Sequence, residues 1–111
     1  MTQLNWQSIM MARQTLGLPV DDATMSTVQE DLEERVDDLF QTINWRAERE
    51  WFDQNPGQLI PSEVTISLHQ QALREAVAQI MDDEVNDPMQ QHLIALEEAE
   101  ETQRQQTLDA S

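Results

Sequence analysis

Apolar and charged side chains alternate most regularly between residues 26 and 43. On a helix that turns about 100° per residue, the apolar side chains of this stretch fall within an arc of roughly 120°. These side chains are Val28, Leu32, Val36, Leu39, Phe40 and Ile43. The rest of the surface carries six carboxylates, those of Glu30, Asp31, Glu33, Glu34, Asp37 and Asp38. The pattern therefore predicts a helix with one core face and one acidic face.

The start and end of this helix are also predicted by local signals. Capping boxes at residues 26–29 and 27–30 both favour a start at this point. The apolar phase breaks at Asn44, because a continued helix would place Trp45 and Phe52 on the acidic side. We therefore expect a kink or a short third helix over residues 44–54, ended by the Asn-Pro-Gly turn that follows.

Two further helices are predicted on either side of this segment. Residues 4–16 show helical apolar spacing, and Gly17 follows where a helix end prefers left-handed backbone. Residues 62–85 form the longest predicted helix, with Ser62 as its cap. A seam with heptad spacing runs along it through Ile66, His69, Leu73, Ala76 and Ile80, which favours packing inside a bundle. Leu68 and Ala72 lie off this seam and indicate contact with a second neighbour.

A fifth helix is expected to begin at Asp87, because Pro88 suits the first helical position and Asp87 can cap it. Met89, Leu93 and Leu96 share one of its faces. The glutamine-rich end, residues 102–111, is expected to fray or to remain mobile. The predicted fold is thus all-α, a small bundle of four to five helices over residues 1–101 with a mobile acidic C-terminal tail.

The charge balance is strongly acidic over the 111 residues. The formal net charge is −16, and all six basic residues are arginine. Such a surface repels nucleic acid and anionic membranes, and it attracts basic proteins or cations. The chain has no cysteine, which excludes a disulfide framework and a thiolate nucleophile. Without a signal-peptide pattern or a long apolar run, the expectation is a soluble protein in the cytoplasm of a host cell.

Catalytic chemistry is not indicated by the sequence. His69 and His92 are the only histidines, and His69 falls on the predicted core seam. Gly17 and Gly57 are the only glycines, so a phosphate-binding glycine loop is excluded. We therefore expect neither an enzyme nor a cofactor.

The acidic junction at residues 82–87 offers hard oxygen donors of the kind that bind calcium or magnesium. Its oxygen donors are Asp82, Asp83, Glu84, Asn86 and Asp87. As a calcium-binding EF-hand loop it fails, because Asp87 stands where glycine is required and Leu93 where the bidentate glutamate is required. We expect a solvated helix junction and no metal site.

The aromatic side chains favour core packing over a base-stacking platform, since this charge repels nucleic acid. Trp45 and Trp51 are the better candidates for contact with a partner, because Arg46 and Arg49 lie beside them and make this short segment the least acidic place from which a protein interface could form.

The acidic residues are the candidate binding surface, and three functions compete for it. The carboxylates of the acidic helix lie at about one per 2 Å, close to the roughly 1.7 Å per charge of duplex DNA, which favours a DNA mimic that occupies the DNA-binding site of a host enzyme. A helical structural or adaptor protein, for example a virion or assembly component, is the alternative, and an antitoxin-like neutraliser of a basic protein is the third. The candidate partner-binding residues are Glu30, Asp31, Glu33, Glu34, Asp37, Asp38, Asp82, Asp83, Glu84, Asp87, Glu97, Glu98, Glu100 and Glu101.

A resemblance to a known family adds to this interpretation. The size, the helical pattern, the Gly-Gln-Leu-Ile-Pro connector at residues 57–61 and the closing run Glu-Glu-Ala-Glu-Glu at residues 97–101 resemble the Ocr-type phage anti-restriction proteins. Those proteins are dimeric DNA mimics that block type I restriction enzymes. The resemblance implies a homodimer and an inhibitory role directed at a DNA-binding protein.

Overall fold

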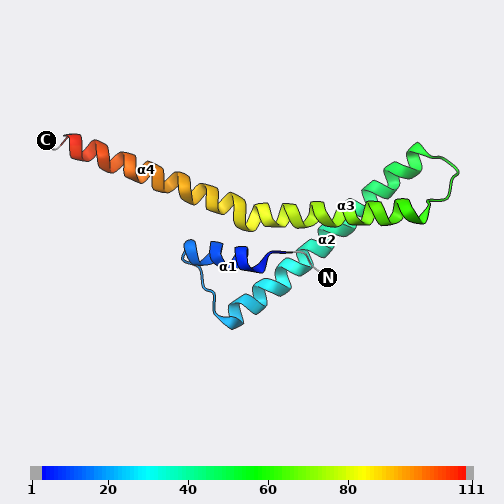
Figure 1. Cartoon of the computed structure of the whole chain (residues 1–111), viewed down its shortest axis with the longest axis horizontal. Helices are drawn as coiled ribbons and strands as arrows, with labels where there is room; N and C mark the ends of the chain where they lie inside the picture. The colour runs from blue at the N-terminus through cyan, green and yellow to red at the C-terminus, as the bar shows by residue number, and fades with distance from the viewer. Residues whose placement is uncertain (1–3, 110–111) are drawn as a thin grey trace.

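The computed structural model describes residues 4–109, and every element within that range is helical (Figure 1). The first helix, α1, spans Trp6–Thr15, and the second, α2, spans Asp22–Gln54. The third, α3, spans Ser62–Met81 and is followed by a π-helical segment, η1, over Asp82–Asn86. The last helix, α4, spans Asp87–Asp109. The predicted all-α class is confirmed.

Helix α2 begins earlier than predicted. Asp21 is its N-cap, and the carboxylate of Asp21 accepts hydrogen bonds from the backbone N–H of Thr24 at 3.1 Å and from the Thr24 hydroxyl at 2.7 Å. Aspartate is among the strongest N-cap residues, so the helix begins at the first cap along the chain that satisfies its free N–H groups. The predicted start at residues 26–27 is wrong for this reason.

Helix α2 also continues without a break through Asn44, so the predicted kink or third helix is wrong. Its buried and half-buried positions follow steps of four residues, through Leu32, Val36, Phe40 and Asn44. Each such step advances about 40° around a helix of 3.6 residues per turn. Figure 1 shows α3 crossing α2 at an angle, so the line of contact turns around α2. The apolar phase therefore changes while the helix continues.

Helix α3 buries the second half of the predicted seam, where Ala76 and Ile80 are buried and Leu73 packs against the core, but not its first half. Ala72, Ala76 and Ile80 are its buried residues, again in steps of four, whereas Ile66 is exposed. The side chains of Ala72 and Ala76 are small, so α2 and α3 can approach closely where they cross. His69 is half-exposed rather than in the core, with its ring edge against Phe40. Ser62 is the first helical residue, and no side chain caps this end.

Helix α3, η1 and α4 form one uninterrupted rod, so the described residues contain three rods rather than four to five helices (Figure 1). The predicted helix start at Asp87 coincides with the start of α4, but no break in the helical backbone precedes it. Proline lacks an N–H group and its ring clashes with the carbonyl four residues earlier, but a π turn widens the helix at that point. The backbone N–H of Asp87 donates to the carbonyl of Asp82, five residues back. The helix absorbs Pro88 in this way.

The predicted C-terminal tail is helical as far as it is described. Helix α4 extends over residues 102–109, and residues 110 and 111 lie outside the described range. The mobility of this end stays a prediction.

The core is small and lies midway along the molecule, between the α4 arm and the turn that joins α2 to α3 (Figure 1). It forms where α1 packs against the first half of α2 and the end of α3, and it contains Leu4, Ile9, Leu32, Val36, Ala76 and Ile80. The chain measures 77 × 35 × 16 Å, with a radius of gyration of 21.0 Å. A compact chain of this length has a radius of gyration of about 13 Å. The molecule is therefore elongated, with α4 as an arm that leaves the core (Figure 1).

Candidate protein-binding surfaces

The acidic face of α2 is arranged as the sequence predicts. Five of its six carboxylate residues are exposed, and Glu33 is half-buried. From Glu30 to Asp38 they cover about 12 Å of helix axis at about 1.5 Å per residue. This face is directed away from the core residues Leu32 and Val36, which lie on the opposite side of the same helix. The carboxylates of α2 thus form a continuous solvent-facing strip.

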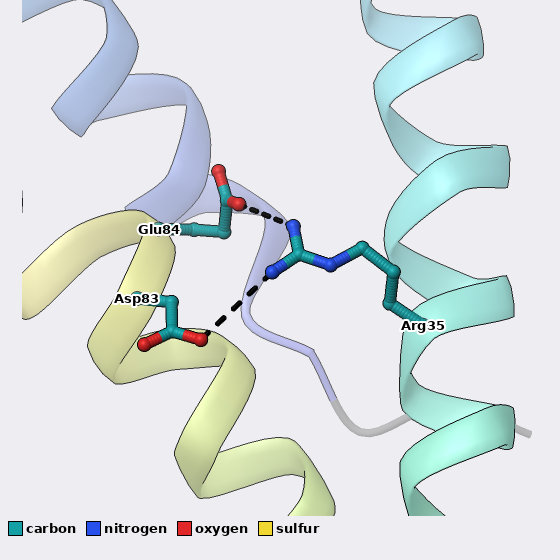
Figure 2. Close-up of polar contacts among 3 residues, drawn as sticks. All are labelled: Arg35, Asp83 and Glu84. Carbon is teal, nitrogen blue, oxygen red and sulfur yellow. Dashed lines mark hydrogen bonds and ion pairs between the residues drawn. The ribbon is translucent and has the colours of Figure 1, made fainter.

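Two other candidate carboxylates have a partner within the chain (Figure 2). The guanidinium of Arg35 on α2 lies 2.5 Å from the carboxylate of Glu84 and 3.8 Å from that of Asp83, both on η1. The hydrogen bond with Glu84 raises the pKa of Arg35, and the negative charges of Glu84, Asp31 and Asp83 raise it further. Arg35 therefore holds η1 against α2, and it partly neutralises the acidic junction.

The remaining candidate carboxylates are divided between the junction and the arm. Asp82 and Asp87 are exposed, and Asp82 accepts a hydrogen bond of 2.6 Å from the amide of Asn86. The four glutamates of residues 97–101 lie further along α4, which leads away from the core in Figure 1. The structure thus brings Asp83 and Glu84 of η1 together with Arg35 of α2 and leaves the α4 group apart. Among residues 4–109, no three histidine, aspartate or glutamate side chains are grouped so that they could hold a metal ion.

An open groove runs between α2 and α3 on one side of their crossing. Its volume is about 750 Å³. Apolar side chains from both helices line it, namely Leu39, Ile43, Ala47, Trp51, Leu68 and Ala72. Charged side chains also line it, namely Arg46, Glu50, Glu75 and Asp82. Leu68 and Ala72, which lie off the predicted seam, both line this groove, but Ala72 is buried by the chain itself and Leu68 is half-buried.

The outward side of α2 also carries an exposed aromatic pair. Trp45 is 62% exposed, and Phe52 is exposed two turns further along. The guanidinium of Arg49 lies 5.3 Å from the centre of the Trp45 ring, a cation–π geometry. Because α2 continues as one helix through Asn44, Trp45 and Phe52 both lie on its outward side, as expected for an unbroken helix. Of the two tryptophans proposed for partner contact, Trp45 is exposed and Trp51 lines the groove.

The apolar face of α4 is exposed along the arm. Leu93 and Leu96 are 55% and 50% exposed, and Ile94 is exposed beside them. These side chains lie beyond η1, where α4 has left the core behind. Leu93 and Leu96 belong to the face that the sequence predicted for a fifth helix, and Met89, the third residue of that face, is half-buried.

Comparison of this chain with protein-family models, with curated proteins and with solved structures found no match. None of the helices in residues 4–109 combines the length and the apolar character that crossing a bilayer requires.

Proposed function

We propose that this chain is a non-catalytic adaptor, a structural component of a protein assembly in which other proteins cover its exposed apolar faces. The observation that carries this proposal is the surface area. The chain exposes 8372 Å², whereas a compact monomer of 12.9 kDa exposes about 6,300 Å². The excess of about 2,000 Å² is more than twice the roughly 800 Å² that each partner buries in a standard interface.

The places where apolar surface is exposed also support an assembly. Stable domains bury the apolar face of each helix against a second layer. Here α4 presents Leu93, Ile94 and Leu96 to solvent, and the groove between α2 and α3 is open. Most helices in proteins are stabilised by packing rather than by propensity alone, so an arm of this length gains stability when a partner covers it.

Site-specific photo-crosslinking in the native host tests this proposal. A photoreactive residue at Leu93 is expected to give a discrete covalent product with another protein. As the matched comparison, a photoreactive residue at Glu34 reports which proteins contact the acidic face of α2. Absence of any product from Leu93 would overturn the adaptor proposal.

DNA mimicry is the second candidate, and the acidic strip on α2 favours it. A rigid helix holds these carboxylates at an axial spacing close to that of duplex charges. On this proposal the crosslink forms through Glu34 instead of Leu93. The inhibited DNA-binding enzyme is released by added duplex DNA, and charge reversal at Glu33, Glu34, Asp37 and Asp38 abolishes inhibition while the fold is retained.

A further inference from the structure

We infer that the groove between α2 and α3 binds an amphipathic helix with basic flanks, supplied by a different protein. This inference rests on the proposed adaptor function and names one surface and one class of partner for it. The apolar floor would receive the apolar stripe of the incoming helix, and the acidic rim would pair with its lysine or arginine side chains.

The dimensions of the groove suit a helix. Its lining on α2 extends from Leu39 to Gln54, which is about 22 Å of helix axis. That length matches about four turns of a bound helix, a common way in which one protein recognises a short segment of another. Ala47 is small, so an incoming side chain of the size of leucine can approach the α2 side of the groove.

The floor of the groove includes apolar side chains from both helices. Leu39 and Ile43 come from α2, and Leu68 comes from α3. Side chains at positions i, i+3, i+4 and i+7 of an incoming helix form an apolar stripe of matching width. An incoming helix bound over this floor would form a three-helix arrangement with α2 and α3.

The charge of the rim selects a basic partner. Glu50, Glu75 and Asp82 line the groove against one cation, Arg46, so the lining carries a net charge of −2 from these four groups. The whole chain carries −16, which extends the same field over the surroundings. Complementary charges accelerate association and reject partners of the wrong sign.

The same charge argues against a second copy of this chain as the occupant. The exposed apolar arm of α4 is followed by Glu97, Glu98, Glu100 and Glu101, with Arg104 beyond them. Placing that arm in an acidic groove would bring like charges together, which is destabilising. A helix with basic flanks from another protein would match both the apolar floor and the negatively charged rim of the groove.

Fluorescence anisotropy of a labelled peptide tests the inference with the full chain. The probe is an 18-residue helical peptide, a length of about 27 Å, with leucine at positions i, i+3, i+4 and i+7 and arginine on both flanks. The groove variant is Glu50→Arg with Glu75→Arg. The matched control is Glu30→Arg with Glu34→Arg, which changes the net charge by the same amount on the outward face of α2. Glu34 lies about 24 Å along the helix axis from Glu50, well beyond the roughly 8 Å screening length at physiological salt.

The groove variant is expected to raise the peptide Kd at least about tenfold, about 1.4 kcal/mol, whereas the control raises it less than about threefold. A second variant, Ala78→Trp, adds bulk to an exposed position that lines the groove and is expected to weaken binding without a change in charge. Circular dichroism of each variant verifies that the helices are retained. Equal weakening by the two charge variants, or equal binding of a peptide with glutamate flanks, overturns the inference.

Two further outcomes separate this inference from the adaptor proposal. Failure of the peptide to bind, together with a retained crosslink through Leu93, removes the groove partner and leaves the adaptor function intact. Sedimentation that shows self-association, lost in Ala78→Trp, identifies a second copy as the occupant and overturns the basic partner.

Discussion

The guanidinium of Arg35 and the carboxylate of Glu84 meet at 2.5 Å, although 49 residues separate them in the sequence. The contact joins the middle of α2 to the π turn from which α4 leaves the core (Figure 2). Asp83 lies 3.8 Å from the same guanidinium, so one cation holds two neighbouring carboxylates. Without that cation, the junction would place several like charges beside the acidic face of α2.

Replacement of Arg35 by alanine is therefore expected to destabilise the fold. The side chain of Arg35 is 39% exposed, so the contribution of a charged hydrogen bond is reduced by solvent to about 1 kcal/mol. Denaturant unfolding followed by circular dichroism measures the loss. The matched control is Arg104→Ala, whose side chain is 78% exposed and 4.0 Å from Glu100. Equal effects of the two substitutions would contradict a special role for Arg35.

Ala76 is completely buried where α3 packs on the core, which gives a second prediction. Ala76→Leu is expected to lower the free energy of unfolding by about 1–3 kcal/mol, because added methylene groups in a packed core force neighbours apart. Ala78→Leu, two residues further along the same helix, lies at an exposed position and is expected to change it by less than about 0.5 kcal/mol. Thermal unfolding of both variants provides the comparison, and a tolerated leucine at position 76 would show that the crossing is not closely packed.

The sequence was sufficient to place much of the core. Leu32, Val36 and Ile80 recur at helical spacing, so their burial follows from periodicity. The angle between α2 and α3 was not predictable in this way, because a crossing turns the contact line around each helix. The shift in the apolar pattern at Asn44 therefore resembles the end of a helix, although the helical backbone continues.

The junction between α3 and α4 shows the same limit of prediction from local sequence pattern. Pro88 normally indicates a helix start or a break, and only the three-dimensional structure shows that a π turn accommodates it. The outward direction of the α2 carboxylates followed from periodicity. The pairing of Arg35 with Glu84 and the groove between α2 and α3 depend on how distant segments meet, which local pattern does not specify.

A pH-dependent prediction concerns the N-cap of α2. The hydrogen bonds from the hydroxyl and the backbone N–H of Thr24 lower the pKa of Asp21 below its ordinary value of 3.8. The ionised carboxylate therefore stabilises the fold fully above that ordinary value, and this stabilisation is lost as the pH falls through the lower pKa of the folded state. Asp21→Asn keeps a capping oxygen without the charge. The difference in unfolding free energy between the natural chain and Asp21→Asn is expected to be constant near neutral pH and to shrink below about pH 4. A difference that does not change with pH would exclude a contribution from the charge.

The arm gives the prediction that most directly separates stability from function. Leu93 and Leu96 are about half exposed, and leucine and glutamine have similar helix propensities. The double substitution Leu93→Gln with Leu96→Gln is therefore expected to change the unfolding free energy of the isolated chain by less than about 0.5 kcal/mol. In contrast, Leu32→Ala in the core is expected to cost about 2–5 kcal/mol. If the adaptor proposal is correct, the arm variant loses its protein partner in crosslinking from a neighbouring position such as Met89, while its thermal unfolding is unchanged. Retention of the partner would show that these leucines are ordinary exposed side chains, because a contact of this kind depends on their burial in the assembly.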